Sequence, residues 1–171
     1  MATYPFLTQI AWDVVNRLTL DWQTRPHLWE REVDIQSELA SRLRSVLTSL
    51  GREISQGYSR STSRVACEPS VRYTYSDSRQ YTCQPDVVIR NDQSENLPEF
   101  AWLCEIKYDQ NKGADWDIEK LIYLCSQNIV QYGCWINISS SVSREASIVW
   151  GRHAGEDRVW TCNVSLPKIG E

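Results

Sequence analysis

The stretch Phe100–Tyr108, FAWLCEIKY, decides how the rest of the chain is interpreted. It is an apolar run of strand length that two charged side chains interrupt. Because side chains alternate across a strand, Glu105 and Lys107 point to one face, and Cys104 and Ile106 point to the other. Burial of charge is costly unless the charge is paired or binds a metal. The strand therefore indicates either an ion pair or a functional site.

A second short strand precedes this one. Pro85–Arg90 (PDVVIR) is β-branched and bounded by polar residues, and residues 91–98 (NDQSENLP) are typical of a turn. The two strands then form a hairpin, which brings Asp86 beside Glu105 with Lys107 within reach. Two adjacent carboxylates repel each other unless a proton or a cation lies between them, and Mg²⁺ with its oxygen ligands suits that position.

This convergence of two carboxylates and a lysine indicates hydrolytic chemistry. The cation would hold a phosphate oxygen and a water together, and the ammonium would orient the water and stabilise charge developing in the transition state. We therefore expect Mg²⁺-dependent hydrolysis of a phosphodiester, with Mn²⁺ as a substitute. The sequence contains no GxSxG, P-loop or GxGxxG motif that would indicate another chemistry.

Pro85-Asp86, then eighteen residues, then Glu105-Ile106-Lys107 resemble the PD-(D/E)XK motif of the restriction-endonuclease-like nuclease superfamily. The resemblance spans residues 30–138 and implies a mixed sheet of about four core strands flanked by helices. It implies that Asp86 and Glu105 are the metal-binding carboxylates and that the carbonyl of Ile106 is a backbone ligand. Lys107 is then the residue that orients the water or stabilises charge.

Members of this family carry an acidic residue on a helix before the motif strands, and this chain offers Glu32 and Glu38. Glu32 lies three residues before Ile35 and seven before Leu39, which places it on the face turned to the sheet. We therefore choose Glu32 as the helix acid, with Glu38 as a near alternative. Gln36, one turn beyond Glu32, is expected to assist by hydrogen bonding.

Each assignment has a structural alternative. Glu105 and Lys107 could form an ion pair on an edge strand open to water, and Asp86 could simply begin a strand. Asp117 and Lys120 lie at the start of the next helix and are interpreted as ordinary first-turn helix residues. The site predicted from the sequence therefore contains neither of them.

Hydrophobic periodicity predicts the remaining elements. We expect helices over residues 6–20, 35–50 and 115–128, the second closed by Gly51 in a left-handed conformation. Residues 55–63 (SQGYSRSTS) are rich in Ser and predict a mobile loop. Further strands are expected at residues 65–67, 71–75, 132–138, 146–150 and 159–164. This order predicts an α/β fold with a mixed central sheet flanked by helices, in a single domain of residues 1–171.

Composition excludes several classes of protein. With 171 residues, 42% hydrophobic and 23% charged, the chain is not disordered, collagen-like or a coiled coil. No apolar run is long enough to span a membrane, and Met1–Tyr4 lacks the basic start of a secretory signal, so we expect a cytoplasmic protein. The six Cys are too far apart for a zinc or redox motif and are interpreted as free thiols, and His27 and His153 as non-ligands.

Charge is distributed unevenly along the chain, whose net charge is −4. Residues 42–79 carry seven Arg against three acidic residues, whereas residues 80–120 carry nine acidic against four basic residues. We expect the first segment, Arg42 to Arg79, to grip a nucleic-acid backbone beside the acidic site. The tyrosines between Tyr58 and Tyr75 are expected to stack on bases, with an ordinary exposed β surface as the alternative.

Two functions follow from these observations. The first is a Mg²⁺-dependent endonuclease or exonuclease that cuts DNA, acting alone, as a homodimer or with a protein partner. The second is a non-catalytic binding or interaction module on the same scaffold, which the acidity and the many Trp and Tyr residues favour. The presence of all three of Asp86, Glu105 and Lys107 favours the nuclease. Hydrolysis of RNA or of a nucleotide by the same site stays open.

Overall fold

The computed structural model describes residues 6–25, 29–74, 78–93, 96–108, 114–138, 146–152 and 160–164. Its helices are α1 (Phe6–Thr24), α2 (Glu32–Ser49) and α3 (Ala114–Ser126). Its strands are β1 (Ile54–Ser55), β2 (Thr62–Ser63), β3 (Val65–Cys67), β4 (Val71–Thr74), β5 (Gln80–Cys83), β6 (Val87–Arg90), β7 (Phe100–Tyr108), β8 (Val130–Ile138), β9 (Ala146–Arg152) and β10 (Trp160–Val164).

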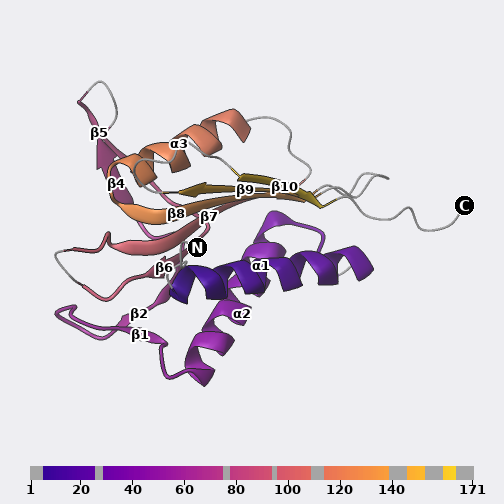
Figure 1. Cartoon of the computed structure of the whole chain (residues 1–171), viewed down its shortest axis with the longest axis horizontal. Coiled ribbons are helices and arrows are strands. Elements are labelled where there is room, and N and C mark those ends of the chain that lie inside the picture. The colour runs from indigo at the N-terminus through magenta and orange to yellow at the C-terminus, as the bar shows by residue number, and fades with distance from the viewer. Residues whose placement is uncertain are drawn as a thin grey trace, which may run out of the picture.

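Six strands form one mixed sheet in the order β10-β9-β8-β7-β6-β3. Strands β7 and β8 run parallel, and the other neighbouring pairs of this sheet run antiparallel. Helix α3 makes the crossover that a parallel pair requires. Figure 1 shows α3 on one side of the sheet and α1 and α2 on the other. The prediction of a mixed α/β fold with helices flanking a mixed sheet is confirmed.

The two faces of β7 belong to different layers of the fold. Cys104 and Ile106 join the apolar core beneath α1 and α2, while Leu103 packs beneath α3. Glu105 and Lys107 follow Leu103 at steps of two, so their side chains lie on the α3 face. The side chains of β7 therefore alternate between the two faces as the sequence predicts, and both Glu105 and Lys107 face α3.

Helix α2 ends as its sequence predicts. Gly51 adopts a φ of +63°, its N–H donates to Thr48 O at 3.0 Å, and the N–H of Arg52 donates to Leu47 O at 2.8 Å. These two bonds form a Schellman motif, which a left-handed residue after the helix allows. At its other end the helix begins at Glu32, earlier than its apolar stripe indicates.

Three local expectations need correction. Helix α1 continues to Thr24 instead of ending near Leu20, because Trp22 is buried against the sheet and extends the apolar stripe. Residues 55–63 are not simply a loop, since β1 and β2 pair across the two ends of this segment. Strand β4 pairs with β5. The sequence did not indicate β5, because most residues of this strand are exposed. These two strands form a separate sheet near one end of α3 (Figure 1).

The cysteines behave as the sequence predicts wherever their side chains are described. Cys67, Cys83, Cys104, Cys125 and Cys134 are all free thiols. Burial raises the pKa of the Cys125 thiol to about 12, which keeps it protonated and unreactive. Of the helices that the structure describes, none is both long and apolar enough to cross a membrane.

Candidate active site on the α3 face of the sheet

Asp86 and Glu105 lie on neighbouring segments of the sheet. Asp86 immediately precedes β6, and the pairing of Val87 with Cys104 continues to place Asp86 opposite Glu105. The backbone N–H of Ile106 donates a hydrogen bond of 2.6 Å to Oδ2 of Asp86. The structure therefore brings together the two carboxylates that the sequence singled out.

The same hydrogen bond determines where the Ile106 carbonyl points. In a strand, the N–H and C=O of one residue face the same edge. Because the N–H of Ile106 reaches the Asp86 side chain, its carbonyl also faces that edge, where β6 has not yet begun. The carbonyl is thus turned toward the carboxylate of Asp86 and away from β8.

Four alternating charges lie next to one another on this face. Nζ of Lys120 is 2.7 Å from Oε1 of Glu105 and 3.2 Å from Oδ1 of Asp117, and Nζ of Lys107 is 3.4 Å from Oδ2 of Asp117. The side chains of Glu105, Asp117 and Lys120 are only 5%, 10% and 11% exposed. The contact between Lys120 and Glu105 is the shortest of these three ion pairs.

Burial shifts both carboxylates toward protonation. It raises the pKa of Asp86 to about 6, which the hydrogen bond from Ile106 opposes and the charge of Glu32 reinforces. It raises the pKa of Glu105 to about 7, against the lowering effect of Lys120 and with further repulsion from Asp86 and Asp117. Burial destabilises the anionic form of both carboxylates. A cation bound beside them would therefore stabilise the ionised site.

Both lysines remain protonated at neutral pH. Burial acts to lower the pKa of Lys107, but Asp117 and then Glu32 outweigh it and hold the pKa above its usual value. Burial acts in the same way on Lys120, where Glu105 and then Asp117 raise the pKa. The site therefore holds two ammonium groups in addition to its carboxylates.

The structure separates the two candidates for the helix acid. Glu32 is half-buried at the start of α2, and its charge raises the pKa of both Asp86 and Lys107. Glu38 instead accepts a 2.7 Å hydrogen bond from Arg42. Of the two, Glu32 is the residue that acts on the site.

Gln36 links α2 directly to the start of β6. This side chain is buried, and its Nε2 donates to the carbonyl oxygen of Asp86 at 3.0 Å and to Oε1 of Glu68 at 3.4 Å. The expected assistance by hydrogen bonding thus takes the form of a bond to the backbone of Asp86. Gln36 thus fixes the backbone of Asp86 and does not bind the Asp86 carboxylate, which stays available to the site.

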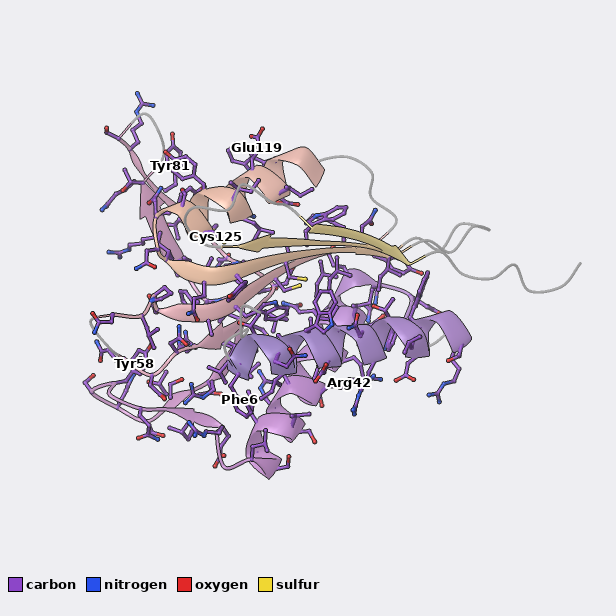
Figure 2. The ribbon with its side chains drawn as sticks, in the orientation of Figure 1. Phe6, Arg42, Tyr58, Tyr81, Glu119 and Cys125 are labelled. Carbon is purple, nitrogen blue, oxygen red and sulfur yellow. The ribbon has the colours of Figure 1, made fainter. Side chains whose placement is uncertain are left out.

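Asp117 and Lys120 are the residues that the sequence interpretation missed. They lie in the first two turns of α3, as expected, but their side chains face the sheet and contact Lys107 and Glu105. Figure 2 shows Glu119 on the outer side of the same helix. A signal was available, because Asp117 and Lys120 each lie four residues before a buried leucine of the helix, Leu121 and Leu124.

Strand β8 adds two polar groups beside the charges. In the parallel register, Trp135 lies next to Glu105 and Asn137 lies next to Lys107. Nε1 of Trp135 and Oδ1 of Asn137 are buried and make no hydrogen bond within the described part of the chain. A donor and an acceptor are therefore available on the face that carries the carboxylates.

Two of the arginines expected to grip nucleic acid serve the fold instead. Arg64 is 2% exposed, and its guanidinium donates to the carbonyls of three residues and to a carboxylate of Asp92 at 2.5 Å. Arg42 pairs with Glu38 and, at 2.6 Å, with Asp21 on α1. Arg64 is therefore not available to a nucleic acid, and a charge count cannot tell such a buried arginine from an exposed one. Arg42 is partly exposed and engaged in ion pairs.

The aromatic expectation also changes in detail. Tyr73 is buried and stacks on Tyr81 with ring centroids 5.8 Å apart, so its face is not open to a base. Tyr81 is 37% exposed and lies on β5, outside the segment that we expected to bind (Figure 2). Tyr75 lies outside the described residues.

The donor set fits a magnesium ion. Within the described ranges, no three His, Cys, Asp or Glu side chains gather into a group that could hold a metal. Mg²⁺ does not require such a group, since it keeps several waters and is commonly bound by one or two carboxylates together with substrate phosphates. Asp86, Glu105 and the Ile106 carbonyl are hard oxygen donors of this kind, and the raised pKa of both carboxylates favours a cation.

Comparison with known proteins finds no matching family model and no matching curated protein. The resemblance to PD-(D/E)XK nucleases therefore rests on the motif residues of the sequence alone. We accordingly argue the function from the site itself.

Proposed function

We propose that this chain is a Mg²⁺-dependent nuclease of the PD-(D/E)XK type that hydrolyses phosphodiester bonds of DNA. The observation that carries the proposal is the placement of Asp86 opposite Glu105, with Lys107 on the same face of the same sheet. One buried and one half-buried carboxylate, each with a raised pKa, lie beside two ammonium groups, and this set suits a divalent cation and an anionic substrate.

The order of elements supports a restriction-endonuclease-like fold. Helix α2 is followed by β3, β6 and β7, then by α3 and β8, with only the small β1–β2 and β4–β5 pairs inserted. These four strands lie side by side in the main sheet, and the two helices cover opposite faces (Figure 1). This is the arrangement of core strands and flanking helices that the resemblance implies.

Each residue has a distinct role in the proposed reaction. Asp86, Glu105 and the Ile106 carbonyl would hold the cation, which would supply Lewis acidity toward a phosphate oxygen. Lys107 orients the attacking water and stabilises the negative charge that develops on the phosphate. Glu32 adds negative charge at the edge of the site and strengthens its attraction for the cation.

The exposed charge of the segment from Arg42 to Arg79 is consistent with a nucleic-acid substrate. Once Arg42 and Arg64 are set aside, the segment still carries exposed arginines at Arg44, Arg52, Arg60 and Arg72. Such side chains bind phosphate without regard to sequence, in a salt-dependent manner. The substrate that this distribution fits best is a polynucleotide backbone, for which we propose DNA.

A cleavage assay tests the proposal. Wild-type chain and Lys107→Ala are incubated with Mg²⁺ or Mn²⁺ and with supercoiled, linear, single-stranded and branched DNA. We expect the wild type to cut at least one substrate and Lys107→Ala to lose at least about 100-fold in rate while remaining folded. Asp86→Ala should lose both cleavage and cation binding. If the wild type cuts none of these DNAs with either metal, the nuclease proposal fails.

A non-catalytic binding module on the same scaffold is the second candidate, and one observation favours it. The ion pairs from Glu105 through Lys120 and Asp117 to Lys107 already balance charge without a cation. In a purely structural network, charges pair in this way to offset the cost of burying them. Failure of the cleavage assay together with absence of cation binding would support this reading.

A further inference from the structure

Lys120 contacts a carboxylate oxygen of Glu105, which is one of the two carboxylates proposed to hold the cation. Its Nζ lies 2.7 Å from Oε1 of Glu105, and the Glu105 side chain is only 5% exposed. The ammonium and a divalent cation seek the same ligand, an electron-rich carboxylate oxygen. A group that is not part of the motif therefore lies at one of the motif carboxylates.

Close approach of both the divalent cation and the Lys120 ammonium to the Glu105 carboxylate is energetically unfavourable. A divalent cation held by Asp86 and Glu105 would lie within a few ångströms of an ammonium that touches Glu105, in a poorly hydrated site. Repulsion between like charges is strong where water is scarce. Cation binding is then coupled to departure of Lys120 from Glu105.

Asp117 gives Lys120 a second place to bind. Its Oδ1 lies 3.2 Å from Nζ of Lys120, from one turn earlier on the same helix, and its other oxygen faces Lys107 at 3.4 Å. The lysine side chain is long and flexible, so its ammonium can leave Glu105 and keep its bond to Asp117. No movement of α3 is needed for this exchange.

We propose that Lys120 is a built-in competitor of the divalent cation. Its ammonium contacts both Glu105 and Asp117 in the metal-free protein, and it leaves Glu105 while keeping Asp117 when the cation binds. The inference rests on the proposed function, because it concerns the cation of that same site. The released ammonium stays beside the cation, where it adds positive charge toward a phosphate. Cation and phosphate would each bind more tightly in the presence of the other, as linkage requires.

Titration calorimetry of the intact chain with Mn²⁺ tests this competition. Lys120→Gln keeps a donor of similar length but removes the charge, and we expect its Kd for Mn²⁺ to be about tenfold lower than that of the wild type. Lys120→Arg retains the charge and should bind no more tightly than the wild type. Arg17→Gln, an exposed change on α1 that removes the same charge, controls for net charge and should stay within about twofold.

A second measurement uses the wild type alone and does not depend on how a variant folds. The ¹³Cε and ¹Hε resonances of Lys120 are followed while Mg²⁺, which is diamagnetic, is added. We expect these resonances to shift with the midpoint of cation binding. Saturation of the site with no change at Lys120 would overturn the proposal.

The outcomes separate this inference from the proposed function. Tighter binding of Mn²⁺ by Lys120→Gln than by the wild type supports the competition. Binding by Lys120→Gln also supports it when binding by the wild type is too weak to measure. Equal or weaker binding by Lys120→Gln, beside clear binding by the wild type, refutes the competition and leaves the nuclease proposal standing. Absence of binding in both proteins refutes the two together.

Discussion

The backbone N–H of Ile106 donates to Oδ2 of Asp86 at 2.6 Å, so the main chain of β7 holds the side chain of the residue just before β6. Asp86 lies just outside β6, where the ladder of backbone hydrogen bonds has not yet started. Its carboxylate takes the place of a missing ladder carbonyl. Oδ1 accepts no hydrogen bond from the described residues and is left for the site.

Asp86→Asn should stabilise the metal-free protein at neutral and higher pH. The pKa of Asp86 rises from 3.8 to about 6 on folding, so its contribution to stability is full below pH 3.8 and is lost as the pH rises through 6. Asparagine keeps an acceptor for Ile106 and carries no charge. We expect a gain of about 2 kcal/mol in the free energy of unfolding near pH 8, vanishing near pH 4.

Urea unfolding of wild type and Asp86→Asn across this pH range, in the presence of a chelator, measures that difference. A gain that is independent of pH would show that the charge of Asp86 is not its cause. Added Mg²⁺ should stabilise the wild type and leave the free energy of unfolding of Asp86→Asn unchanged.

Glu32→Gln and Glu38→Gln form a matched pair on one helix. Both remove one negative charge from α2, but only the first removes a charge that acts on Asp86 and Lys107. We expect Glu32→Gln to weaken Mn²⁺ binding several-fold and Glu38→Gln to leave it unchanged while costing about 0.5 kcal/mol from its pair with Arg42. Calorimetry supplies the first quantity and urea unfolding the second. Equal effects on Mn²⁺ binding would contradict the assignment of Glu32.

Asn137→Leu should separate stability from activity. Oδ1 of Asn137 is buried beside Lys107 and accepts no hydrogen bond from the described residues, so replacing the amide by an apolar group of similar size removes an unsatisfied acceptor. We expect the free energy of unfolding to stay within about 1 kcal/mol of the wild type or to rise. Because the amide lies next to Lys107, which is proposed to orient the attacking water, we expect cleavage to fall by about tenfold. A parallel loss of stability and cleavage would show that Asn137 is only structural.

Gly133→Ala tests how closely α3 must lie against β8. An added Cβ would meet Cβ of Leu121 at 3.1 Å, so the helix that carries Asp117 and Lys120 would have to move outward. We expect a loss of about 1–2 kcal/mol in the free energy of unfolding and an altered Kd for Mn²⁺.

Gly51→Ala is the control for that change. It costs about 1 kcal/mol through strain at a φ of +63°, in open space at the end of α2, and should leave Mn²⁺ binding unchanged. If both variants altered the Kd for Mn²⁺ equally, general loss of stability and not the position of α3 would be the cause.

The parts of the fold that were predictable depend on local patterns. The alternation in FAWLCEIKY gave the faces of β7 correctly, and the hairpin from β6 to β7 followed from the turn between them. Gly51 marked the end of α2 because few other residues tolerate its conformation. In each case, the residues that determine the structure lie within a few positions of one another.

The unpredicted parts depend on contacts between distant segments. Whether Lys120 reaches Glu105 depends on how α3 docks on β7 and β8, and the approach at Gly133 that permits this docking leaves no local pattern. The burial of Arg64 is similar, because its acceptors come from segments far apart in the chain. Strand β5 is mostly exposed and so lacks the apolar alternation of a core strand.

The most direct test of the central claim is a crystal of the wild-type chain soaked in Mn²⁺, measured for anomalous scattering. We predict one strong peak coordinated by carboxylate oxygens of Asp86 and Glu105 and by the carbonyl of Ile106, with Nζ of Lys120 moved away from Glu105 and still in contact with Asp117. A map without a peak at this position, in which Lys120 still contacts Glu105 at a saturating concentration of Mn²⁺, would contradict the claim that these residues form a metal-dependent active site.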